Sequence, residues 1–146
     1  MFDKFTEHWR MLQKTGTITE KEFKRATFSQ HYRTVEEFRA PFDDTQSLVS
    51  QAGLRLKSIR TQLTRCEHAY RDANGAISRK EFAASLIPTM RSWSETVFSS
   101  ALVDREQQEA QAIVDQFYQC YEDEIAAAPD GHAMDYIHAI MEIEKT

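Results

Sequence analysis

The chain has 146 residues, a net charge of −5 and 28% charged residues. This length is typical of one domain, and an acidic chain lacks the dense basic surface that binding to duplex nucleic acid requires. No apolar run approaches the roughly 20 residues that a membrane span needs. The two cysteines, Cys66 and Cys120, lie far apart and fit reduced thiols. We therefore expect a folded cytoplasmic protein that binds neither nucleic acid nor membrane.

The first part of the chain, residues 1–53, predicts helices that lead into a sheet. Apolar residues recur at helical spacing over 2–14 and indicate a first helix. Thr19 and Thr34 are each followed three residues later by glutamate, which is the capping-box pattern of a helix start. We expect Pro41 to end the helix that begins after Thr34. A further short helix, capped by Asp44, is expected before the sheet.

Two segments predict strands. Residues 54–63 alternate apolar and polar side chains, as a half-buried strand does, and a loop is expected to follow them. Residues 134–143 alternate more loosely and predict a final strand. Because a lone two-stranded ribbon is only marginally stable, the two strands indicate a larger sheet or pairing with another chain.

The segment between the strands, residues 78–127, predicts helices. Ser78 with Glu81 forms a third capping box. We expect Pro88 to interrupt that helix and to open a second one. Asp104 is expected to cap a long helix that ends near residue 127.

Two similar segments, 16–23 and 75–82, fit the second half of an EF-hand calcium loop. The position of the first ligand, which is normally aspartate, is occupied by Met11 in one copy and by Tyr70 in the other. Capping boxes explain the shared residues as turns and helix starts. The alternative function is a non-enzymatic helical interaction module with a degenerate calcium loop at 70–81, in which Asp72 is a ligand.

Three stretches carry a resemblance to a known family. They are Gly16-Thr17-Ile18-Thr19 through Tyr32-Arg33-Thr34-Val35-Glu36-Glu37, then Gln51-Ala52-Gly53-Leu54-Arg55-Leu56, and Met90-Arg91-Ser92-Trp93-Ser94-Glu95. In order and spacing they resemble the C-terminal portion of class I S-adenosylmethionine-dependent methyltransferases. The nearest likeness is to bacterial relatives of the plant salicylate, benzoate and theobromine carboxyl methyltransferases.

The resemblance implies a fold and a role. The fold would be the α/β, Rossmann-like fold of class I methyltransferases, with 54–63 and 134–143 as its sixth and seventh strands, paired antiparallel. Residues 78–127 would be a helical cap over the substrate pocket. Five residues match substrate-binding positions of the family, and the substrate would be a small-molecule acid: Tyr32, Met90, Trp93, Phe2 and Tyr136.

The family's cofactor site marks a departure. That site uses a glycine-rich turn, whereas the four glycines of this sequence are isolated, at 16, 53, 75 and 131. We therefore expect a part of a methyltransferase that lacks the half that binds S-adenosylmethionine. This part would have no catalytic residue or metal ligand of its own and would be inactive alone. An exposed sheet edge would favour self-association.

Overall fold

The computed structural model describes residues 1–146 and divides them into two compact units. The helical unit comprises Met1–Phe28 and Cys66–Met134, and the ribbon unit comprises Ser29–Arg65 and Asp135–Thr146. The fold is mixed, with seven helices and one two-stranded antiparallel sheet. The chain thus enters the ribbon unit, returns to the helical unit and ends in the ribbon unit.

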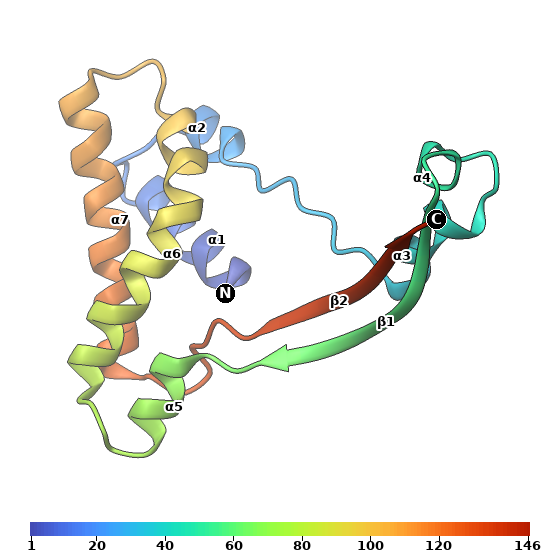
Figure 1. Ribbon diagram of the computed structural model, residues 1–146. Coiled ribbons are helices and arrows are strands. Elements are labelled where there is room, and N and C mark those ends of the chain that lie inside the picture. The colour runs from blue at the N-terminus through green and yellow to red at the C-terminus, as the bar shows by residue number, and fades with distance from the viewer. The chain divides into compact units, whose positions relative to one another are not determined.

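The helical unit contains five helices: α1 (Phe2–Lys14), α2 (Glu20–Arg25), α5 (Glu67–Ala73), α6 (Arg79–Ala101) and α7 (Gln107–Ala127). The two long helices, α6 and α7, run side by side and make the most extensive helix–helix contact (Figure 1). Shorter contacts join α1 to α7 and α5 to α6. These contacts arise because each helix carries an apolar stripe that must leave water.

An aromatic core lies between the helices of this unit. The rings of Phe98 and Phe117 are 4.2 Å apart between centroids, and Trp9 lies 4.9 Å from Phe98. Phe5 contacts both Phe98 and Phe117 at 5.7 and 5.8 Å. All four side chains are buried. Aromatic side chains of this size dominate the energy of a core, so this cluster is the main source of the unit's stability.

The ribbon unit contains α3 (Val35–Asp43), α4 (Leu48–Gln51), β1 (Leu54–Thr64) and β2 (Tyr136–Lys145). The two strands pair antiparallel (Figure 1), which confirms that part of the predicted fold. Both short helices contact β1. No side chain of residues 29–65 or 135–146 is buried, so this unit has no core of its own.

Local signals in the sequence placed several helix starts correctly. The three expected capping boxes, at Thr19, Thr34 and Ser78, are all present with both of their reciprocal hydrogen bonds. Gly16 and Gly75 follow α1 and α5 with φ angles of +79° and +67°, which glycine adopts without strain. Both glycines therefore end their helices as turn residues.

The two prolines do not end their helices as expected. Pro88 lies inside α6, which runs unbroken from Arg79 to Ala101, and Pro41 lies inside α3. Pro88 and Ala84 are both exposed, so water can hydrate the Ala84 carbonyl that loses its usual partner. Because the apolar residues on both sides of Pro88 are buried in one core, packing keeps the helix continuous.

Two expected caps are also wrong. Asp44 does not cap α4, because the Ser47 hydroxyl accepts the hydrogen bond from the Ser50 amide. The Asp44 carboxylate instead accepts a hydrogen bond from the Gln46 amide. Asp104 does not cap α7, whose N-cap residue is Glu106. The Asp104 carboxylate instead forms ion pairs with Lys21 and Arg25 of α2. A local sequence pattern cannot predict these pairs, because α2 is far away in the sequence.

The strand boundaries differ by a few residues from the sequence prediction. The first strand extends one residue beyond 54–63, and the second begins at Tyr136 and ends at Lys145, not at 134–143. Met134 is buried in the helical core and so is not available to the sheet. The expected loop after β1 contains α5, which begins at Glu67 after only Arg65 and Cys66.

Candidate functional site

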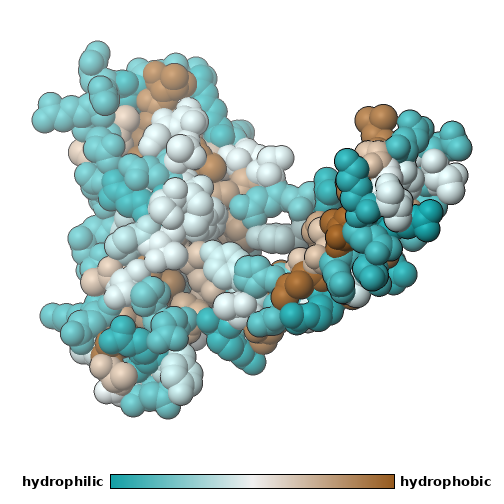
Figure 2. Space-filling model, in the orientation of Figure 1, coloured by the Kyte–Doolittle hydropathy of each residue, from teal (hydrophilic) through white to brown (hydrophobic).

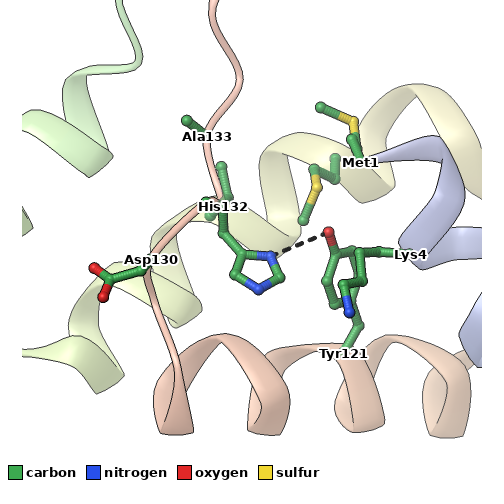
Figure 3. A pocket seen from close by; sticks show the side chains of 9 residues that line it. Met1, Lys4, Tyr121, Asp130, His132 and Ala133 are labelled. Carbon is green, nitrogen blue, oxygen red and sulfur yellow. Dashed lines mark hydrogen bonds between the residues drawn. The ribbon is translucent and has the colours of Figure 1, made fainter.

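A cavity of about 160 Å³ lies in the helical unit between α1, α6, α7 and the turn that follows α7. Met1, Leu86 and Met90 form its apolar wall. Lys4, Tyr121 and His132 provide polar groups (Figure 3). Apolar walls with a few polar groups are the usual composition of small-molecule sites. This cavity is therefore the candidate functional site.

An ion-pair network borders the cavity. The Lys4 ammonium lies 2.9 Å from a carboxylate oxygen of Glu7 and 2.8 Å from one of Glu124. The Nε2 atom of His8 lies 2.6 Å from the other Glu124 oxygen, although without hydrogen-bond alignment. Burial raises the pKa of Glu124, but Lys4 and His8 outweigh it, so the net shift is downward. Glu124 is thus a carboxylate at neutral pH.

Tyr121 and His132 form the uncharged part of the site. The Tyr121 hydroxyl and the Nδ1 atom of His132 share a 3.4 Å hydrogen bond (Figure 3). Burial raises the pKa of Tyr121 to about 12 and lowers the pKa of His132 below its ordinary value. At neutral pH both groups are therefore uncharged, and each can donate or accept a hydrogen bond with a ligand.

An aromatic group in the same unit contains two of the residues that the resemblance suggested. The rings of Phe2 and Trp93 are 5.9 Å apart, and Phe28 lies 5.4 Å from Phe2. The indole Nε1 of Trp93 is buried without a hydrogen-bond partner. Met90 lies one helical turn before Trp93 on α6, and it lines the cavity. The same helix thus positions both side chains.

The five suggested substrate residues fall into two groups. Phe2, Met90 and Trp93 lie together in the helical unit. Tyr32 and Tyr136 belong to the ribbon unit, where their side chains are 77% and 48% exposed. Tyr32 donates a hydrogen bond to Gln30, and Tyr136 stacks on His138. The helical unit by itself therefore assembles three of the five.

Sequence reasoning missed the cavity-lining residues Lys4 and Tyr121, and also His8 and Glu124, which lie beside the cavity in the ion-pair network. Lys4 and His8 share one face of α1, and Tyr121 and Glu124 share one face of α7, because residues three or four apart on a helix are neighbours. That spacing was visible in the sequence. The packing of these two faces against each other was not, since it depends on which helices meet.

The chain's residues do not fit the two ligands that the sequence raised. No group of three histidine, cysteine or acidic side chains is placed to hold a metal ion. In the loop 70–81, the Glu81 carboxylate accepts a hydrogen bond from the Ser78 amide and serves the helix cap. The strand β1 leads through Arg65 and Cys66 into α5 without a glycine-rich turn, so this strand offers no cradle for S-adenosylmethionine.

Comparison with known proteins adds no assignment. No protein-family model matches the sequence, and no curated protein matches it. None of the helices is long and apolar enough to cross a membrane. A proposal for the function therefore rests on the geometry within each of the two units.

Proposed function

We propose that this chain is the C-terminal, substrate-contacting part of a class I S-adenosylmethionine-dependent methyltransferase that acts on a small carboxylic acid. The observation that carries the proposal is the antiparallel pairing of β1 with β2 across an intervening helical segment. This arrangement is the one that the resemblance implies for the last two strands and the cap of that fold.

The state of the ribbon unit supports a larger, Rossmann-like sheet. A two-stranded ribbon without buried side chains is marginally stable at best. Ile137, Met141 and Ile143 of β2 are exposed. Further strands and a covering layer would remove this apolar surface from water. The cofactor-binding strands of the proposed enzyme would be that addition, supplied from outside these residues.

The cavity supports a small, largely apolar substrate. Its volume of about 160 Å³ is close to the ~150 Å³ of an engineered cavity that holds benzene, so it has room for one aromatic ring. Leu86 and Met90 would contact the ring, and Lys4 would offer a cation to the carboxylate. These residues would bind and orient the acid, and orientation is what a methyl transfer requires of its acceptor. We assign no residue of this chain to the transfer itself.

Methionine methyl groups offer a direct test. The chain contains five methionines, of which Met90 lines the cavity and Met11 is an exposed residue of α1 that does not. In a titration with benzoate followed by methyl NMR of labelled methionine, we expect the Met90 signal to shift saturably and the Met11 signal to stay. Replacing Leu86 by Trp should fill the cavity and abolish the shift.

Two results would count against the proposal. One is an unchanged Met90 signal at saturating benzoate in the folded protein. The other is a Met90 signal that still shifts in Leu86→Trp, because the ligand would then lie outside the cavity. The proposal includes a cytoplasmic location and self-association through the ribbon.

A further inference from the structure

The two edges of the ribbon differ in how well they resist pairing with another strand. The edge of β1 carries a bulge between Leu56 and Ser58, and basic side chains at Arg55, Lys57 and Arg60. Bulges and charges are the devices by which proteins protect exposed strand edges. The edge of β1 is therefore protected.

The edge of β2 lacks a bulge of its own, and its charged residues Glu142, Glu144 and Lys145 are confined to its C-terminal end. β2 has no proline, and its run from Tyr136 to Met141 contains no acidic or basic residue other than His138. Apolar side chains stand exposed along the ribbon surface (Figure 2), and on β2 they include Ile137 and Ile143. Because β2 has a partner strand on one side alone, its other edge presents a row of main-chain donors and acceptors that a further strand can use.

The two faces of the ribbon also differ, which restricts how a strand can be added. One face presents Ile137, Met141 and Ile143 of β2 opposite Leu63, Ile59 and Leu56 of β1. The other face presents mainly polar side chains, such as Glu142 of β2 opposite Ser58 of β1, which share a hydrogen bond. An added strand must continue both faces, because a shift by one residue would join an apolar face to a polar one.

We propose that β2 pairs antiparallel with β2 of a second copy of this chain, with the two Ile140 residues on the twofold axis. In this register Ile137 lies opposite Ile143 of the second copy, and Ala139 lies opposite Met141. His138 lies opposite Glu142, and the symmetry repeats each contact. This pairing rests on the self-association that the proposed function includes and gives it a register, whereas the benzoate titration of Met90 tests the substrate site separately.

Neighbouring registers that keep both faces continuous are less favourable. With the axis at Met141, Glu142 lies opposite the apolar Ile140 of the second copy. With the axis at Glu142, two carboxylates lie directly opposite each other, which is destabilising. The axis at Ile140 pairs apolar with apolar and His138 with Glu142 between Ile137 and Ile143, and beyond them Tyr136 lies opposite Glu144. A single strand pair is a small interface, so the dimer dissociates on dilution.

A charge exchange tests this register. We expect sedimentation velocity over a concentration series to show a monomer–dimer equilibrium for the natural chain. His138→Glu places like charges opposite each other twice and should raise the dissociation constant at least about tenfold. The double variant His138→Glu with Glu142→His restores opposite partners and should recover dimerisation. Arg60→Glu, on the β1 strand, is the matched control and should leave the constant unchanged.

Cross-linking tests the same register without reference to charge. Ile140→Cys places the two thiols next to each other across the axis, so mild oxidation should give a covalent dimer. Ile137→Cys separates them by six residues along the strand, roughly 20 Å, and should give none beyond the background of the natural cysteines. A monomer at every concentration, or a dimer that ignores both the charge exchange and the cysteine position, would overturn the proposal. A dimer broken by Met141→Lys but insensitive to His138→Glu would indicate face-to-face packing and would overturn it as well.

Discussion

The helical unit and the ribbon unit contain similar proportions of regular structure but differ in what holds that structure together. Five helices of the helical unit enclose a shared core of aromatic and aliphatic side chains, with Phe117 and Val114 fully buried at its centre. The ribbon unit has hydrogen-bonded strands and capped helices but buries no side chain. Regular hydrogen bonding therefore does not by itself make a stable unit.

This difference indicates which unit needs contacts beyond its own residues to be stable. Net stability comes mainly from apolar burial, because the main-chain hydrogen bonds of an exposed ribbon replace bonds to water of nearly equal strength. We infer that the helical unit folds by itself. The ribbon unit gains its order from whatever covers its apolar face and extends its sheet.

Hydrogen exchange should show the largest contrast. At concentrations low enough for a monomer, amides in the middle of α6 and α7 should exchange only through global unfolding, whereas those of β1 and β2 exchange through local opening. We expect protection factors at least about a hundredfold lower in the ribbon, measured by NMR. Equal protection in both units would mean that the ribbon is stabilised in a way that its burial does not reveal.

Truncating a side chain in the helical core should lower the free energy of unfolding much more than truncating one in the ribbon. Phe117→Ala removes a fully buried ring in contact with Phe98 and Trp9, and should lower the free energy of unfolding by about 3–5 kcal/mol. Ile137→Ala, at a side chain that is 75% exposed, should change it by less than about 0.5 kcal/mol. Urea denaturation followed by circular dichroism would measure both. A comparable loss from the two variants would contradict the contrast between the units.

The capping boxes offer a matched pair of acidic residues. Glu22 caps α2 but also binds Arg105, which lies 2.6 Å away in a largely buried ion pair, whereas Glu37 plays the same capping role on exposed α3. The bond to Arg105 lowers the pKa of Glu22 to about 2. The ordinary value is 4.5. Because the folded state favours the charged form of Glu22, the ion pair contributes about 3 kcal/mol of stability, which is complete above pH 4.5 and is lost as the pH falls towards 2.

Glu22→Gln should therefore remove that contribution and flatten the acid limb of a stability profile measured between pH 2 and pH 7. Glutamine still fits the capping box, so the substitution isolates the charge. Glu37→Gln should have a clearly smaller effect, since its carboxylate is exposed. An unchanged acid limb in Glu22→Gln would show that the Arg105 pair does not stabilise the fold.

A buried hydroxyl pair should give the smallest effect. The hydroxyls of Ser94 and Tyr118 lie 2.6 Å apart where α6 meets α7, and the Ser94 hydroxyl also donates to the Met90 carbonyl. Ser94→Ala leaves the Tyr118 hydroxyl buried without its partner and should cost about 1–2 kcal/mol. Adding Tyr118→Phe should recover most of this loss, as a double-mutant cycle would show. Ser85→Ala, an exposed hydroxyl on the same helix, should be close to neutral.

The sequence by itself determined the features that depend on neighbouring residues. A capping box joins residues three apart, and a left-handed turn needs one glycine, so Thr19, Ser78 and Gly16 could be assigned without a fold. Alternation of apolar and polar residues located β1 for the same reason. The suggested substrate residue Met90 could be named from a resemblance, but nothing in the sequence placed it beside Lys4 and His132.

Tertiary structure decided the features in which distant segments compete for the same surface. Burial on both sides of Pro88 kept α6 continuous, although the local preference of proline predicted a break. The bond from Arg105 to Glu22, and the cavity lined by Lys4 and Tyr121, depend on which helices meet. Local hydrogen bonds have one partner within reach, whereas an apolar face can pack against any other apolar face. The chain as a whole selects among those packings by the total area that it buries.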